Sequence, residues 1–228
     1  MQLILLPGMD GTGILFKPFI DELPQDLAVN PISYPDNEHL NYQQLADLVR
    51  KSLPIEEEFI IVAESYSGPV AYLLVQENLP NLKSIVFVTT FLRSPRPLLL
   101  KILATLPLEF LFSFAVPHFI VKRLLFGLNA KNENISLFYK AMEKPNPRVL
   151  AGRLRDISNL SIHLKQLNVR AAYIQAKEDK LVPSSNASAF IKCFKTLNVY
   201  QISGPHFLLQ SNPQECARIV LEEIILFS

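Results

Sequence analysis

A serine, an aspartate and a histidine occur in an order and in local contexts that suit nucleophilic catalysis. Ser65 lies in the stretch AESYSG, which follows the apolar run FIIV. Asp179 lies in AKEDKLVP after another apolar run, and His206 lies in SGPHFLLQ after the last one. A histidine can take the proton of a serine hydroxyl and return it to a leaving group, while a carboxylate orients the imidazole and stabilises its cation. These residues therefore predict a Ser-His-Asp site.

The stretch around Ser65 departs from the G-x-S-x-G pattern of a nucleophile elbow, the sharp strand-to-helix turn that exposes a serine hydroxyl above a sheet. Ala63 and Ser67 stand in place of the two glycines. These positions need small side chains because the strand and the helix approach closely there, and alanine and serine are small. We expect Ser65 to be the nucleophile; the alternative is a serine in a plain turn.

Neighbouring residues compete for the same roles. Ser67 is a possible nucleophile, but centring the motif there places Ser65 and Pro69 at the flanking positions, which is a poorer match. Glu178 adjoins Asp179 and is an alternative acid. The remaining histidines, at positions 39, 118 and 163, are expected to be structural or exposed.

A glycine-rich loop, LLPGMDGTG at 5–13, directly follows the first apolar run. In serine hydrolases with a nucleophile elbow, one oxyanion-hole N–H comes from such an early loop and the other from the residue after the nucleophile. This rule points to the backbone N–H groups of Met9 and Tyr66. A phosphate-binding loop is the rival interpretation, but the spacing matches neither common phosphate motif; a plain turn is the third.

Short apolar, β-branched runs alternate with helical patterns along most of the chain, which favours parallel strands joined by crossover helices. The predicted strands cover 2–6, 29–34, 59–63, 84–89, 170–176 and 198–202. Apolar spacing predicts helices over 41–53, after Ser67, over 184–194 and over 213–227. We therefore expect an α/β fold with a doubly wound, mostly parallel sheet.

The alternation stops between about residues 91 and 160, where the sequence is rich in leucine, phenylalanine and proline. We interpret 91–160 as a helical cap or lid inserted into a hydrolase core made of 1–90 and 161–228. Charged residues and prolines interrupt its apolar runs, so no uncharged stretch approaches the roughly 20 residues that a membrane-spanning helix needs.

Composition narrows the remaining classes. The 228 residues are 49% hydrophobic and carry a net charge of +1, which suits one α/β domain and gives no sign of a nucleic-acid partner. Cys193 and Cys216 lie far apart without metal-ligand spacing, so we expect no disulfide, no metal and no other cofactor. The apolar start MQLILLPG lacks the features of a signal peptide and predicts a strand, hence a cytoplasmic protein.

Taken together, these motifs resemble the α/β-hydrolase superfamily over essentially the whole chain. LPGMDGTG and AESYSGP are more narrowly similar to small bacterial carboxylesterases related to the esterase and acyltransferase domain of plant phytyl ester synthases. They are broadly similar to the esterases that remove the methyl ester of pimeloyl-[acyl carrier protein] in biotin synthesis. The resemblance implies a catalytic triad of Ser65, His206 and Asp179, because Asp179 has the family spacing to the following Val-Pro, and oxyanion donors Met9 and Tyr66.

The cap differs in charge from the rest of the chain. It holds eleven lysines and arginines against four acids, a net charge of about +7, while the remainder is about −6. A basic, apolar cap suggests a buried acyl chain and an acidic carrier such as acyl carrier protein, coenzyme A or an anionic lipid surface. The candidate acyl-pocket residues are Phe110, Phe112, Phe114, Phe119, Leu124 and Leu125, and the candidate carrier-binding residues are Lys122, Arg123, Arg153 and Arg155. The alternative is that these groups form only the packed core and the solvated surface of the cap.

The leading functional hypothesis is a serine carboxylesterase that cleaves an acyl ester through an acyl-enzyme, with pimeloyl-[acyl carrier protein] methyl ester as one candidate substrate. An acyltransferase or thioesterase acting on a lipid, coenzyme A or carrier-linked acyl group would use the same residues. A hydrolase fold kept only for ligand binding is the non-enzyme alternative, because the elbow has lost its glycines.

Overall fold

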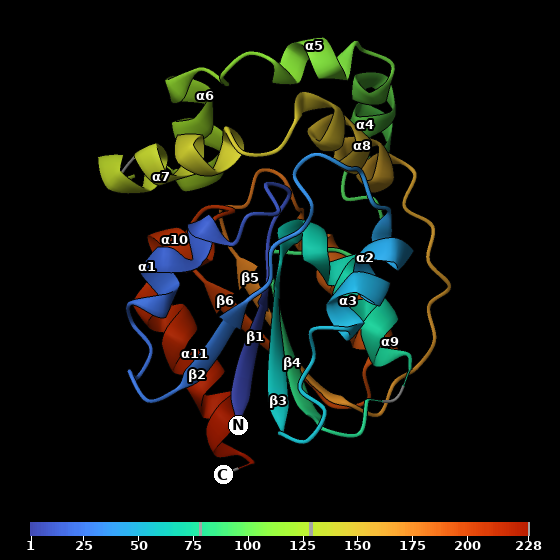
Figure 1. Cartoon of the computed structure of the whole chain (residues 1–228), viewed down its shortest axis with the longest axis vertical. Helices are drawn as coiled ribbons and strands as arrows, with labels where there is room; N and C mark the ends of the chain where they lie inside the picture. The colour runs from blue at the N-terminus through green and yellow to red at the C-terminus, as the bar shows by residue number, and fades with distance from the viewer. Residues whose placement is uncertain (78, 128–129, 228) are drawn as a thin grey trace.

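A parallel β-sheet forms the centre of the protein (Figure 1). The computed structural model describes residues 1–77, 79–127 and 130–227. Within these residues six strands pair in the order β2-β1-β3-β4-β5-β6, all in parallel. The strands are β1 (Gln2–Leu6), β2 (Ala28–Pro31), β3 (Phe59–Glu64), β4 (Leu82–Val88), β5 (Arg170–Ala176) and β6 (Leu197–Ile202).

Burial along the strands follows their place in the sheet. Every residue of the central strand β3 is buried, as expected for a parallel strand covered on both faces. The edge strand β2 is shorter than the predicted 29–34 and ends at Pro31. Beyond it Ile32 N–H still donates to Leu5 O at 2.9 Å, but Tyr34 N–H donates to Gly11 O at 2.7 Å. The chain therefore leaves the sheet to pair with the loop that follows β1.

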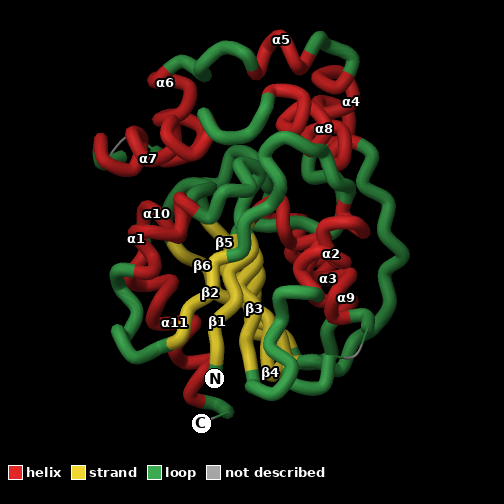
Figure 2. Tube along the Cα trace, in the orientation of Figure 1, coloured by secondary structure: helices red, strands yellow, loops and turns green. Residues whose placement is uncertain are grey.

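Helices cover both faces of the sheet (Figure 2). One face packs against α1 (Lys17–Ile20), α10 (Leu208–Ser211) and α11 (Pro213–Ile225), with η1 (Ile14–Phe16) beside them. The other face packs against α2 (Tyr42–Arg50), α3 (Gly68–Val75) and α9 (Ala187–Cys193). The short helix η2 (Ser65–Ser67) directly precedes α3, and η4 (Ser184–Asn186) directly precedes α9. Each face has its own buried apolar cluster. This arrangement confirms the predicted α/β class.

A group of helices lies over the carboxyl ends of the strands, between β4 and β5 in the chain (Figure 1). It consists of α4 (Pro97–Ala104), α5 (Leu108–Phe112), α6 (His118–Val121), η3 (Lys122–Phe126), α7 (Asn132–Met142) and α8 (Pro147–Ser158). We call this segment, 91–160, the cap; residues 128 and 129 within it lie outside the described residues. None of the helices described in the chain is both long enough and apolar enough to cross a membrane.

Candidate active site

The turn between β3 and α3 gives Ser65 an unusual backbone conformation. Its φ is +46°, in the left-handed region that residues other than glycine seldom adopt. A nucleophile elbow needs such a turn because it lifts the serine hydroxyl out of the sheet. The Ser65 carbonyl accepts a hydrogen bond from the Thr90 hydroxyl. The backbone carbonyl of Thr90 in turn accepts a hydrogen bond from Tyr173 Oη at 2.9 Å. The neighbouring strand ends therefore hold the strained turn in place.

The positions around the turn are tightly packed. Ala63 and Ser67 are fully buried. The Ser67 hydroxyl donates to the carbonyl of Pro7, and Tyr34 Oη donates to Ser67 Oγ at 2.6 Å. A Cβ at Gly68 would overlap the Thr90 side chain, so this position requires glycine. Ser67 is therefore not merely small: its hydroxyl joins the turn to the glycine-rich loop after β1.

Three side chains from separate loops form a continuous hydrogen-bonded chain. Ser65 Oγ lies 2.9 Å from His206 Nε2, and His206 Nδ1 lies 2.8 Å from Asp179 Oδ2. Both His206 and Asp179 are almost completely buried. Such a chain can pass the serine proton to the imidazole and stabilise the resulting cation.

Asp179 is held by the backbone of its own loop. Its Oδ1 accepts hydrogen bonds from the N–H groups of Leu181 at 2.8 Å and Val182 at 2.9 Å, which leaves Oδ2 for His206. Glu178 turns elsewhere and accepts from Gly204 N–H. Of the two acids considered in the sequence, the structure thus places Asp179 against the histidine.

Met9 lies in a turn that Gly11 N–H closes by donating to Gly8 O at 3.1 Å. Arg153 of α8 donates from Nη1 to the carbonyls of Met9 and Asp10, each at 2.9 Å. Gly11 has a φ of +74°, and a Cβ there would lie 2.5 Å from Arg153 Nη1, so the guanidinium fits only against glycine. Met9 and Ser65 line the same cavity. The backbone N–H groups of Met9 and Tyr66 remain the predicted oxyanion donors.

Arg153 corrects one prediction. We expected it on a basic surface, but it is 2% exposed, and Nη2 also donates to Pro35 O at 2.9 Å. Burial lowers the pKa of its guanidinium. No local sequence pattern indicates this role, because the three carbonyls come from segments more than a hundred residues away. Arg123 and Arg155 are exposed and Lys122 is half-buried, so these three remain candidates for a carrier.

An apolar cavity of about 330 Å³ lies between the cap and the sheet, with Ser65 and His206 in its wall. Of the predicted acyl-pocket residues, Phe112, Leu124 and Leu125 line it. Leu100, Leu103, Val116, Ile120, Val121, Phe138 and Met142 also line it, and the sequence did not single them out.

Phe110, Phe114 and Phe119 do not line this cavity, which corrects the prediction for these three. Each is more than 60% exposed, and the rings of Phe110 and Phe114 contact one another with centroids 5.0 Å apart. The reason is local: Leu108 and Phe112 take the inner side of α5 and Val121 that of α6, while Phe114 lies in the segment between the two helices.

Solved structures share this architecture. A thermophilic esterase from Thermogutta terrifontis has a TM-score of 0.77 at 13% identity, covering 98% of this chain and 89% of that one. An extracellular α/β-hydrolase from a Paenibacillus species has a TM-score of 0.70 at 17% identity, covering 98% of each chain. The chain has the α/β-hydrolase fold.

The same fold extends to a thioesterase from the prodiginine biosynthetic pathway in Streptomyces coelicolor, named RedJ. It has a TM-score of 0.70 at 16% identity, covering 97% of this chain and 85% of that one. No protein-family model matches the chain, and no curated sequence matches it. The α/β-hydrolase fold expected from LPGMDGTG and AESYSGP is thus confirmed by three-dimensional similarity.

Within this α/β-hydrolase fold, Glu64 is a buried acid next to Ser65, the predicted nucleophile. Glu64 was not among the residues singled out from the sequence. Its Oε1 accepts from Gln210 Nε2 at 3.0 Å. Burial raises the pKa of Glu64 to about 7, with Asp10 adding to the rise, while the Gln210 hydrogen bond and His206 oppose it. A carboxyl with this pKa is partly neutral at physiological pH, so the site carries less negative charge than its residues suggest.

Tyr66, the residue after Ser65, connects this turn to the cap. Its hydroxyl donates to Asp156 Oδ2 at 2.9 Å, and His39 Nε2 lies 2.8 Å from the same oxygen. Burial raises the pKa of the Tyr66 hydroxyl, so the ring stays neutral. His39 thus has a structural position, packed against Gly152 of α8. Across the described residues, no group of three or more acids, histidines or cysteines is arranged to bind a metal.

Proposed function

We propose that this protein is a serine hydrolase that cleaves a carboxylic ester through an acyl-enzyme. The observation that carries the proposal is the hydrogen-bonded chain from Ser65 Oγ through His206 to Asp179. The strained conformation of Ser65 supports it, because such strain is typical of catalytic positions.

In the proposed reaction, Ser65 Oγ attacks the ester carbonyl carbon while His206 Nε2 takes its proton. The carbonyl oxygen becomes an oxyanion that accepts hydrogen bonds from the N–H groups of Met9 and Tyr66. When this intermediate collapses, the bond to the alcohol breaks and His206 gives the proton to the leaving oxygen. A water, deprotonated by His206, then attacks the acyl-enzyme; as the bond from the acyl carbon to Ser65 Oγ breaks, His206 returns the proton to Oγ and the acid is released. Asp179 keeps Nδ1 of His206 protonated throughout.

The cavity supports an acyl substrate with an apolar chain. Its wall is almost entirely apolar apart from the catalytic residues and the neighbouring Asp10 and Arg96. A methylene occupies about as much space as a water, roughly 30 Å³, so about 330 Å³ accepts on the order of ten carbons. A pimeloyl ester bound to acyl carrier protein fits this range and stays one candidate.

Hydrolysis of p-nitrophenyl butyrate tests the proposal. We expect Ser65→Ala and His206→Ala each to lower kcat/KM by about 10³-fold or more. The matched controls, Ser188→Ala and His163→Ala, replace exposed residues outside the site and should keep full activity. Activity that survives both site variants would rule out the proposed triad.

Thioester hydrolysis and acyl transfer form the second candidate, favoured by the fold shared with a thioesterase. Comparison of butyryl thioesters with butyryl oxygen esters, and of products with and without an added long-chain alcohol, separates the three reactions. Rescue of a biotin-requiring strain that lacks its pimeloyl ester esterase would support the biotin role, and failure to rescue would count against that substrate.

A further inference from the structure

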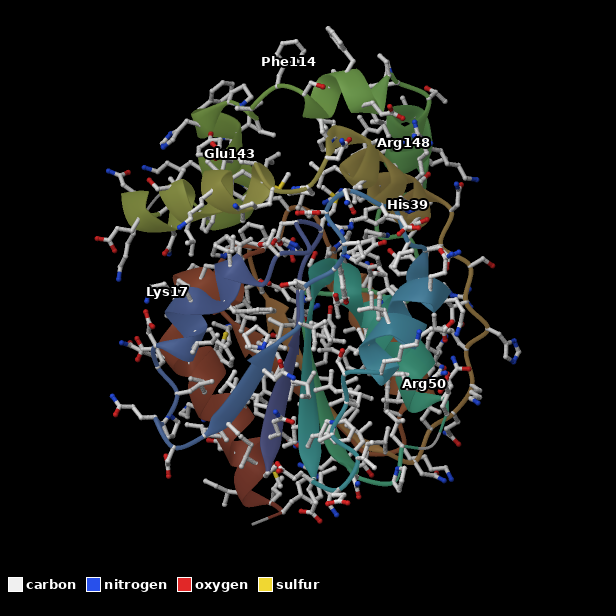
Figure 3. All side chains as sticks on the ribbon, in the orientation of Figure 1. Lys17, His39, Arg50, Phe114, Glu143 and Arg148 are labelled. Carbon is white, nitrogen blue, oxygen red and sulfur yellow. The ribbon has the colours of Figure 1, made fainter. Side chains whose placement is uncertain are left out.

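Large apolar side chains are concentrated on the outer surface of the cap. We call this surface the cap face; its residues are Leu98, Leu99, Ile102, Leu106, Phe110, Leu111, Phe114 and Phe119. Ile102, Phe110, Phe114 and Phe119 are 65%, 62%, 61% and 68% exposed. Figure 3 shows Phe114 pointing away from the molecule, at the end opposite the two termini. Single exposed apolar residues are common on proteins, but a group of this size marks an interaction surface.

The helices beneath the cap face are apolar on both sides. In α4, Leu100 and Leu103 line the acyl cavity while Leu98 and Ile102 point outward. In α5, Phe112 lines the cavity while Phe110 is exposed. A helix that is apolar all round needs an apolar environment on both sides. The cavity supplies such an environment on one side, whereas the apolar side chains on the other side are exposed.

In sequence, the segment that carries the cap face is basic. From 91 to 126 the chain has five basic residues and one acid, Glu109. Lys101 lies within the face, while Arg93 and Arg96 precede it and Lys122 and Arg123 follow it. Long basic side chains can keep their charge in a polar layer while their stems lie along an apolar one. Apolar side chains bordered by lysine and arginine are the pattern of a segment that lies in the interface of an anionic bilayer.

The cap face also adjoins the acyl cavity. Leu99 is 50% exposed on the face and lines the cavity as well. Leu99 therefore connects the exposed cap face with the wall of the cavity that Ser65 also lines.

We propose that the cap face docks onto an anionic lipid surface, with its phenylalanines and leucines in the acyl-headgroup boundary and its basic side chains against the headgroups. A protein partner is the less favoured occupant, because the middle of the segment, 97–121, has only Lys101, Glu109 and His118 for directional polar contacts. The other basic residues lie at its two ends in sequence, and contact with lipid headgroups needs no fixed geometry from them. The docking goes beyond the proposed function, since it depends on the cap alone.

Vesicle flotation of the full chain tests the docking, with Ser65→Ala in every sample so that turnover plays no part. We expect this protein to float with phosphatidylcholine vesicles that contain phosphatidylglycerol, and more weakly with phosphatidylcholine alone. Adding Phe110→Ser and Phe114→Ser should lower the partition coefficient by about tenfold or more, because two exposed rings leave the bilayer. Adding Lys101→Gln and Arg123→Gln should lower the partition coefficient on anionic vesicles by about fivefold for each charge removed, and should not change it on phosphatidylcholine alone. Added salt should also lower the partition coefficient on anionic vesicles.

Ile55→Ser with Ile191→Ser is the matched control, because these isoleucines are 90% and 59% exposed outside the cap. It should leave flotation unchanged, and thermal unfolding should show that every variant is folded. Absence of flotation, or flotation that the phenylalanine variant leaves unchanged, would overturn the proposal. The proposal would also be overturned if the protein did not bind vesicles but formed a dimer, or a complex with acyl carrier protein, that Phe110→Ser and Phe114→Ser disrupt. Ester hydrolysis by the phenylalanine variant with Ser65 intact is measured separately, so failure of docking and failure of the proposed function are distinguishable.

Discussion

At the scale of single residues, the two positions that lost glycine have different roles. Ala63 fills buried space in β3, whereas the Ser67 hydroxyl bonds to Pro7 O and accepts from Tyr34. A pattern search penalises both substitutions equally, but the structure gives Ser67 a function in joining the elbow to the glycine-rich loop.

Ser67→Ala tests that function. It keeps the residue small but leaves the Pro7 carbonyl and the Tyr34 hydroxyl without this partner. We expect a loss of about 1–3 kcal/mol in the free energy of unfolding, measured in urea. In a Tyr34→Phe background the loss should be smaller, because one of the two orphaned groups is gone. An equal loss in both backgrounds would contradict the proposed coupling.

Glu64 makes stability depend on pH. The pKa of its carboxyl is about 7 in the folded protein and 4.5 in the unfolded chain, so between these values the folded state holds a proton that the unfolded state releases. The contribution of Glu64 to the free energy of unfolding therefore falls as pH rises from about 4.5 to 7, by about 3 kcal/mol.

Glu64→Gln removes this titration while keeping an acceptor for Gln210 Nε2. Urea unfolding at pH 5 and pH 8 should show the variant gaining stability relative to the unsubstituted protein at the higher pH. A constant difference between the two proteins at both pH values would show that Glu64 does not titrate in this range.

At the scale of elements, α8 of the cap supports the loop after β1. Arg153 spans from this helix to the carbonyls of Met9 and Asp10 and to Pro35 O, so the cap and the predicted oxyanion loop are fixed to one another. A lysine cannot reproduce the fork of a guanidinium that serves several carbonyls at once.

We expect Arg153→Lys to lower kcat by about tenfold and the free energy of unfolding by about 1–3 kcal/mol, since at least one buried carbonyl loses its donor. Ester hydrolysis and thermal unfolding measure the two effects. Arg155→Lys, one exposed position further along the same helix, should change neither. An unchanged kcat in the Arg153 variant would show that the loop does not depend on this anchor.

The elements themselves were largely predictable, because their patterns are local. The bounds of the strand over 170–176 were predicted to the residue. Asn41 is the N-cap of α2, and its capping box fixes where that helix begins. Arg153, Glu64 and Gln210 could not be found in this way. Their roles come from contacts between segments more than a hundred residues apart, which neither periodicity nor motif spacing records.

At the scale of the whole molecule, an apolar cavity lies between the cap and the sheet, and under the proposed function its volume limits the length of the acyl chain. Leu103 faces the cavity, and its neighbour Ile102 faces outward on the same helix. Leu103→Phe should shift the preferred p-nitrophenyl ester toward shorter acyl chains, because it adds volume to the cavity wall. Ile102→Phe adds comparable volume on the outside and should leave the chain-length profile unchanged. If Leu103→Phe and Ile102→Phe gave the same chain-length profile, the acyl chain would not bind against Leu103 in this cavity.

Labelling with a fluorophosphonate tests the proposal that Ser65 is an activated nucleophile. The probe should modify the folded protein at Ser65, as located by peptide mass spectrometry, and should modify neither Ser65→Ala nor His206→Ala at an appreciable rate. Failure to label the folded protein, or labelling at another serine, would contradict the account and favour a hydrolase fold kept for ligand binding.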